Sequence, residues 1–178
     1  MNKNNKQRKS TLKIEEAFIQ LIQDNDLNKI TVSKICEITN LNRSTFYANY
    51  LDVYDLADKV CENIEDEFVN LFKDGDLLQN GGRKNDGIKM FYHIYENQLS
   101  YKTYFKLIGN RSKSILTNQS AKNEKNFDDG CADYHVEFFK SGLNAVIIKW
   151  LNGGCKETPE EMYRVIESEY RLRFESEE

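Results

Sequence analysis

The chain has 178 residues, of which 39% are hydrophobic and 30% are charged, a balance typical of folded globular proteins. No apolar run approaches the roughly 18 residues that span a bilayer. The polar, basic first ten residues also lack the apolar stretch of a secretory signal. The sequence therefore predicts a cytoplasmic protein with no membrane partner.

The four cysteines and two histidines show no metal-binding spacing. We expect the cysteines, at positions 36, 61, 131 and 155, to be small buried apolar residues. The chain also lacks the spacing of a nucleophile–base pair and a glycine-rich phosphate loop. We therefore predict no metal, no cofactor and no enzymatic activity.

The net charge of −4 is unevenly distributed, because residues 1–50 carry +3 and the remainder carries −7. The first thirteen residues contain five basic side chains and no acidic one. A basic head on an acidic body suits a polyanion-binding module. A solvated N-terminus accounts for the charge equally well, so charge alone leaves both interpretations open.

Three helices are predicted in the first 50 residues. The first carries one apolar stripe, made of Ile14, Ala17, Phe18, Leu21 and Ile22. A polar turn over residues 24–29 ends it, and Thr31 is positioned as the N-cap of a short second helix. Asn40 is suited to a left-handed turn, since asparagine tolerates positive φ. Asn42 then caps a third helix that runs to about Tyr50.

The rest of the chain is also predicted to be helical, with about nine helices in all and no strand alternation. Asp52 caps a fourth helix reaching about Leu71, and residues 73–86 form a glycine-containing linker. Helices follow around residues 88–95 and 101–108, with a polar segment over 109–130 that includes a short helix near 112–118. Two longer helices cover 132–151 and the stretch beginning at Thr158, where Pro159 and Glu161 complete a capping box.

Two short helices joined by a tight turn, behind a packing helix and a basic arm, indicate a helix-turn-helix. Its second helix must enter a major groove about 12 Å wide, so one side is polar and the other apolar. We expect Phe46 and Tyr50 to anchor that helix. Polar residues at its N-terminal end face the base edges, with Arg43 pairing to guanine: Asn42, Arg43, Ser44 and Thr45. Thr31, Tyr47 and Asn49 are expected to contact phosphate oxygens.

The run from Thr31 to Tyr50, followed by Leu56, resembles the helix-turn-helix of the tetracycline-repressor (TetR-like) family. The resemblance implies a DNA-binding domain over residues 8–68, with the motif at 31–50, and a C-terminal regulatory and dimerisation domain over 69–178. Two positions depart from the family pattern. Asn40 replaces the usual glycine of the turn. Val53 stands where the family tends to carry a lysine that contacts DNA phosphate, which puts one backbone contact in doubt.

In this family the last two helices form a dimer interface, and the sequence agrees with that expectation. The helix over 132–151 is apolar on more than one face, with Phe138, Ala145 and Ile148 on a second side, so one neighbour cannot cover it. A homodimer would place two recognition helices about 34 Å apart on a palindromic double-stranded operator.

The resemblance also implies an effector pocket among the middle helices. A dense aromatic cluster is the candidate lining for a small-molecule effector: Phe91, Tyr92, Tyr95, Tyr101, Tyr104 and Phe105. Ordinary core packing is the competing interpretation, because aromatic residues at helical spacing usually belong to a core.

Taken together, these patterns predict a sequence-specific DNA-binding transcriptional regulator, a repressor relieved by an effector. The alternative is a helical interaction protein of the same fold that binds a protein partner rather than DNA. Val53 favours that alternative, since the expected phosphate-binding lysine is missing.

Overall fold

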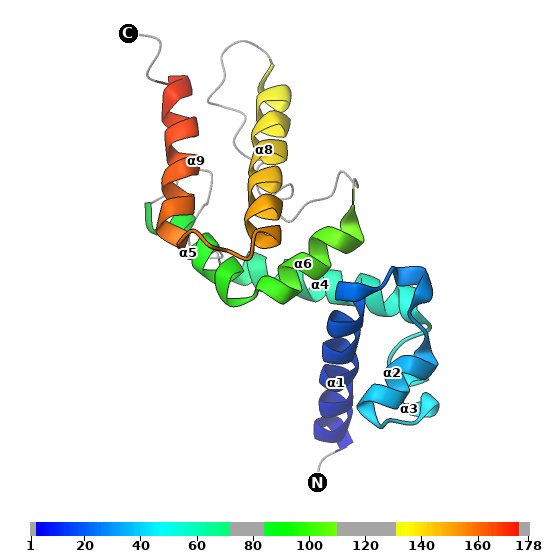
Figure 1. The fold of residues 1–178 in the computed structure, drawn as a ribbon. Coiled ribbons are helices and arrows are strands. Elements are labelled where there is room, and N and C mark those ends of the chain that lie inside the picture. The colour runs from blue at the N-terminus through cyan, green and yellow to red at the C-terminus, as the bar shows by residue number, and fades with distance from the viewer. Residues whose placement is uncertain (1–2, 72–83, 110–130, 175–178) are drawn as a thin grey trace. The chain divides into compact units, whose positions relative to one another are not determined.

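The computed structural model describes residues 3–71, 84–109 and 131–174, which fold into eight α-helices and one short 3-10 helix without a strand (Figure 1). The predicted all-α class is confirmed. The short helix expected near 112–118 lies outside the described residues, as does most of the predicted linker. None of the helices in the described ranges combines the length and apolar character that a bilayer-spanning segment needs.

The chain divides into two compact units. The first contains residues 1–66 together with Lys102–Gly109, and the second contains the remainder. Helix α4 (Val53–Leu71) begins in the first unit and ends in the second, whereas α6 (Gln98–Ile108) runs the other way. The domain boundary predicted after residue 68 falls inside α4.

The first unit starts with α1 (Lys3–Asp24), which is longer than its apolar stripe suggested. The segment expected to be a basic arm is instead the first turns of this helix. No proline or glycine interrupts residues 3–24, so nothing in the backbone ends the helix early. Its inner face buries Ile14, Phe18 and Ile22, each at most 1% exposed.

The turn between α2 (Val32–Thr39) and α3 (Arg43–Tyr47) follows the sequence prediction. The Thr31 hydroxyl accepts a hydrogen bond from the Lys34 amide (3.2 Å), which caps α2. Asn40 adopts the left-handed conformation with φ 53° and ψ 41°. Its amide reaches back to the carbonyls of the last α2 turn, so asparagine fills the role that glycine usually plays there.

Helix α3 ends at Tyr47, three residues before the predicted end at Tyr50. The Asn49 side-chain amide donates to the Thr45 carbonyl (2.7 Å), and the Asn49 backbone amide turns to Phe46 (2.9 Å). These bonds tighten the last turn and close the helix. Asn42 occupies the N-cap position, but its side chain makes no capping bond.

Helix α4 begins where predicted. The Asp52 carboxylate accepts from the amides of Tyr54 (2.8 Å) and Asp55 (2.9 Å). Val53, Leu56, Ala57, Val60 and Ile64 are buried along its inner face. They pack with the α1 stripe and with Ile35, Phe46 and Tyr50 as the core of the first unit.

The second unit contains α5 (Lys84–Glu96), α8 (Ala132–Asn152) and α9 (Pro159–Phe174), with α5 packed along α9. Trp150 of α8 is 3% exposed, and its ring lies 5.7 Å from Phe91 and 6.1 Å from Tyr95 of α5. The capping box of α9 is confirmed, since Thr158 and Glu161 exchange bonds of 2.8 and 3.2 Å.

The cysteines only partly follow the prediction. Cys36 and Cys155 are buried and Cys61 is half-buried. Cys131 is exposed, because it occupies the N-cap position immediately before α8 rather than an inner helical face. In the described ranges, no group of three or more His, Cys, Asp or Glu side chains is placed to hold a metal ion.

Candidate nucleic-acid interface

Helix α3 presents a polar end and an apolar side. Asn42, Arg43 and Ser44 are exposed at its N-terminal end, whereas Phe46 is completely buried and Tyr50, beyond the helix end, is 3% exposed. The Arg43 guanidinium lies at the surface and donates to the Ser33 hydroxyl of α2 (2.5 Å). The arginine fork is therefore held across the outside of the two helices.

The other candidate residues differ in how much of their polar surface is available. Thr31 is exposed, but its hydroxyl oxygen already caps α2. Tyr47 is 55% exposed, and its ring meets Phe46 edge-on at 5.6 Å. Thr45 and Asn49 are half-buried.

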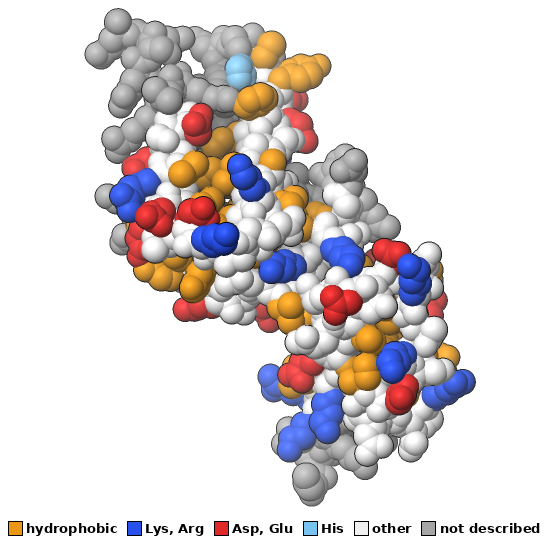
Figure 2. All heavy atoms as spheres, viewed as in Figure 1, with side chains coloured by type: hydrophobic (Ala, Val, Ile, Leu, Met, Phe, Trp, Pro, Cys, Tyr) orange, Lys and Arg blue, Asp and Glu red, His pale blue; other side chains and the backbone are white. Residues whose placement is uncertain are grey.

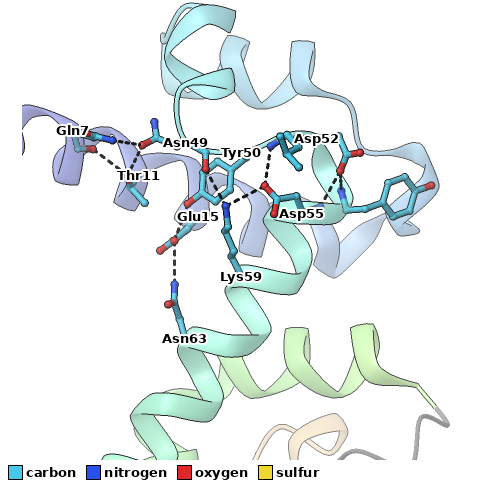
Figure 3. A network of polar contacts seen from close by, with 11 residues as sticks. Gln7, Thr11, Glu15, Asn49, Tyr50, Asp52, Asp55, Lys59 and Asn63 are labelled. Carbon is cyan, nitrogen blue, oxygen red and sulfur yellow. Dashed lines mark hydrogen bonds and ion pairs between the residues drawn. The ribbon is translucent and has the colours of Figure 1, made fainter.

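Asn49 belongs to a polar network between α1 and the end of α3 (Figure 3). Its side-chain oxygen accepts from Gln7 Nε2 (3.2 Å) and Thr11 Oγ1 (3.3 Å). The Thr11 hydroxyl also lies 3.1 Å from the Gln7 carbonyl, so one proton is shared between two acceptors. Together with the bond to Thr45, these contacts occupy most of the hydrogen-bonding capacity of Asn49.

Tyr50 and Glu15 extend the network toward α4 (Figure 3). The Tyr50 hydroxyl donates to the Glu15 carboxylate (2.8 Å), which also accepts from Asn63 (3.1 Å). Burial and the neighbouring Glu15 carboxylate raise the pKa of Tyr50 above its ordinary value. Tyr50 is therefore a fixed, neutral anchor between α1 and the loop that follows α3.

The start of α4 carries carboxylates instead of the family's lysine. Val53 is 7% exposed and belongs to the core. Besides the Asp52 cap, the Asp55 carboxylate accepts from the Leu51 amide (2.8 Å), and this bond, with a lesser contribution from Lys59, lowers the pKa of Asp55. The amides of Leu51, Tyr54 and Asp55 are thus already bonded to acidic side chains.

Lys59 does not replace the missing lysine, because its ammonium group is occupied within the unit. It donates to the Asn49 carbonyl (3.1 Å) and to Asp55 (3.1 Å), and it lies 5.2 Å above the Tyr50 ring.

Positive charge in the first unit is concentrated on the outside of α1. Figure 2 shows Lys and Arg side chains beside the N-terminal end of that helix. Arg8, Lys9 and Lys13 are exposed, and none of them forms one of the ion pairs observed in the described part of the chain.

The six aromatic candidates for an effector pocket have varied surroundings. Phe91, Tyr101 and Tyr104 are buried, Phe105 is half-buried, and Tyr92 and Tyr95 are each 42% exposed. Tyr92 donates to Glu160, and Tyr104, which with Phe105 belongs to the first unit, donates to Glu65 (2.9 Å).

Tyr101 is the exception among the six. Its ring meets His93 edge-on at 5.7 Å, yet its hydroxyl, in a side chain 2% exposed, has no hydrogen-bond partner among the described residues. Burial, with a smaller contribution from Glu67, raises its pKa, so the phenol stays protonated.

Three residues that support this surface were not predicted from the sequence: Gln7, Thr11 and Ser33. A signal was present for two of them. Gln7 and Thr11 continue the spacing of the inner α1 stripe backward from Ile14 and Phe18, which places two polar side chains on a face that packs inward. Ser33 lies on the outer side of α2 and carries no comparable pattern.

Comparisons with known proteins agree with this architecture. Residues 82–168 match the TetR_C_8 family, described as a transcriptional regulator C-terminal region. A curated relative, the "HTH-type dhaKLM operon transcriptional activator DhaS" of Lactococcus lactis, is 29% identical over 92 residues, which is 52% of this chain and 46% of the relative. The matched segment thus spans less than half of that activator.

Solved structures resemble the whole described chain. A TetR transcriptional regulator from Streptococcus agalactiae has a TM-score of 0.62 at 23% identity, covering 92% of this chain and 94% of its own. The dihydroxyacetone kinase operon activator DhaS has a TM-score of 0.56 at 20% identity, covering 92% and 95%. The fatty acid degradation regulator FadR from Bacillus halodurans has a TM-score of 0.61 at 12% identity, covering 92% and 93%. The chain therefore shares the fold of these regulators, and its residues 82–168 are similar to a transcriptional regulator C-terminal region.

Proposed function

We propose that the chain is a sequence-specific DNA-binding transcriptional regulator whose α3 enters the major groove of an operator. The observation that carries the proposal is the two-sided character of α3. Arg43 and Ser44 are exposed at its start, while Phe46 is locked in the core. An arginine fork at an exposed helix start is suited to the two acceptors on the major-groove edge of guanine.

The test begins with DNA selection, because the operator is not known. Duplexes bound by the unmodified protein are selected from a randomised library, and affinity is then measured by fluorescence anisotropy. Arg43→Ala is expected to weaken binding to the selected duplex by about 1–3 kcal/mol and to relax the sequence preference. Lys29→Ala removes an exposed cation outside α3 and is the matched control. Failure to select a sequence, or equal affinity of the Arg43 variant, would contradict the proposal.

The salt dependence of binding separates DNA from a protein partner, the alternative that Val53 raised. Binding to DNA releases counterions from the phosphates, so the affinity falls steeply as salt rises. The similarity of the chain to transcriptional regulators favours DNA. An affinity for the selected duplex that is insensitive to salt between 50 and 200 mM, roughly the range over which phosphate contacts lose most affinity, would count against it.

The proposal includes a homodimer formed through α8 and α9. One face of α8 buries Leu143, Ile147 and Trp150 within the unit. Another face exposes Tyr134 (79%), Phe138 (62%) and Ile148 (36%), with Ala145 between them. A Cβ added at Gly142 would meet nothing within 4 Å, so a second helix has room to approach there.

Sedimentation velocity tests the dimer. Phe138→Glu is expected to raise the dimer dissociation constant by at least about tenfold, because it places a charge in an apolar contact. Asn28→Glu, at an exposed position of the first unit, is the control for added charge. A dimer unaffected by Phe138→Glu would require a different interface.

We also propose that a small-molecule effector binds the second unit and reaches Tyr101. The unpartnered, buried hydroxyl supports this, since an effector with a hydrogen-bond acceptor would satisfy it. The test measures the melting temperatures of the unmodified protein and of Tyr101→Phe in the presence of small neutral molecules that carry a hydrogen-bond acceptor. Compounds that stabilise both proteins equally would contradict a role for the hydroxyl.

The direction of regulation follows from a transcription assay on a promoter that carries the selected sequence. The sequence predicts a repressor, whereas the curated relative DhaS is named as an activator. Transcription that falls when the protein is added supports repression, and transcription that rises supports activation.

A further inference from the structure

Asn49 was expected to contact DNA phosphate, but its bonds point to a different role. Asparagine offers two acceptor sites on its oxygen and two amide protons. Both acceptor sites are used by α1, through Gln7 and Thr11, and one amide proton is used by the Thr45 carbonyl. Since the side chain is also half-buried, little of its polar capacity is left for a phosphate.

The backbone of the same residue is held from a second direction. Lys59 of α4 donates to the Asn49 carbonyl (3.1 Å), at the C-terminal end of α3 where a positive charge complements the helix dipole. Asn49 is therefore the point at which α1, α3 and α4 are joined by polar bonds (Figure 3).

The polar contacts of Asn49 matter because α3 has only five residues, Arg43–Tyr47. A helix of little more than one turn has too few internal bonds to fix its own direction. Base readout requires hydrogen-bonding groups held within about 0.5 Å and 10–20° of their working geometry. The residues that hold the two ends of α3 consequently decide where Arg43 points.

We propose that Asn49 is a positioning residue for the recognition helix: it fixes α3 against α1 and makes no contact with DNA. The inference rests on the proposed function, because it assumes that α3 reads base edges. It predicts that losing the Asn49 side chain damages sequence readout while leaving general attraction to DNA intact.

The experiment compares a selected duplex with a scrambled one of the same composition. Asn49→Ala is expected to weaken binding to the selected duplex about five- to tenfold, the equivalent of one hydrogen bond, and to leave the scrambled duplex unchanged. A phosphate contact would instead weaken both duplexes equally. Asn25→Ala is the matched control, because the Asn25 side-chain amide donates to the Leu21 carbonyl near the end of α1 and not to α3.

A double-mutant cycle tests whether Asn49 acts through α1. Thr11→Val keeps the shape of the side chain but removes the hydroxyl that faces Asn49. The double variant is expected to bind the selected duplex no more weakly than Asn49→Ala alone, because both changes break the same contact between α1 and Asn49. Fully additive losses would overturn the proposal.

The two proposals fail in different ways. If Arg43→Ala weakens specific binding but Asn49→Ala changes neither duplex, or weakens both alike, the positioning role is wrong and the DNA-binding function stands. If the unmodified protein selects no sequence, the function itself is wrong. Circular dichroism monitors folding, and should Asn49→Ala not fold, Thr11→Val alone is decisive: loss confined to the selected duplex supports positioning, and any other result overturns it.

Discussion

Replacing Lys59 with methionine keeps most of the side-chain stem and removes the charge. The charge-assisted bond to the Asn49 carbonyl contributes about 1 kcal/mol when half-exposed. The position above the Tyr50 ring contributes about 0.5–1 kcal/mol. The ion pair with Asp55 adds little because both side chains reach solvent. Part of the total is offset by the freedom that the lysine loses, so we expect Lys59→Met to lower the free energy of unfolding by about 1–2 kcal/mol.

Two measurements check this expectation. Urea denaturation followed by circular dichroism gives the stability, with Lys29→Met as the control for an ordinary exposed lysine paired to Asp26. Anisotropy titrations at several salt concentrations give the slope of log affinity against log salt. Because Lys59 is turned to its own unit, the slope should not change. Each phosphate that a lysine neutralises changes this slope by about 0.9. A slope that becomes shallower by that amount in Lys59→Met would mean that Lys59 neutralises a phosphate, and the internal role would be refuted.

Three further predictions concern single residues. Gly87→Ala should lower the free energy of unfolding, measured by urea denaturation, by about 1–3 kcal/mol, because a Cβ there would lie 2.5 Å from the Tyr163 ring between α5 and α9. Tyr163→Ala in the same chain should relieve that loss. Tyr101→Phe should leave the melting temperature of the ligand-free protein unchanged or raise it, because the hydroxyl removed has no partner in the described part of the chain. The pKa of Asp55 is lowered in the folded state, so its contribution to stability is complete above its ordinary value of 3.8 and is lost as the pH falls below that value. An NMR titration of the Asp55 carboxyl carbon with a midpoint at or above 3.8 would contradict this direction.

Three helix caps could be predicted from sequence because each depends on residues only a few positions apart. Thr31 caps an amide three residues later, Asp52 caps amides two and three residues later, and Thr158 pairs with Glu161. The left-handed Asn40 was equally local, since it follows from the conformational freedom of one side chain. Local chemistry therefore located the two helices of the motif and the start of α4.

The supporting contacts of the motif could not be predicted in the same way. Asn49 is joined to Gln7 and Thr11, which lie 42 and 38 residues earlier. No short-range pattern specifies such a pair, because the three-dimensional packing of α1 on α3 brings it together. A different contact of Asn49, with the Thr45 carbonyl, explains why the predicted end of α3 lies three residues too late. An asparagine that turns its amide back to Thr45 is indistinguishable in sequence from one that continues the helix.

Val53, which stands where the family tends to have a lysine, and the acidic side chains at the start of α4 both limit what this helix can offer to DNA. Val53 points into the core, so this position supplies no cation. Asp52 and Asp55 meanwhile bond to the amides of Leu51, Tyr54 and Asp55, which in an uncapped helix would be available to an anion. A phosphate at this helix start would meet two carboxylates and no unbonded amide among those three. The start of α4 therefore offers no cation to DNA, and through Lys59 this helix holds the segment that follows α3.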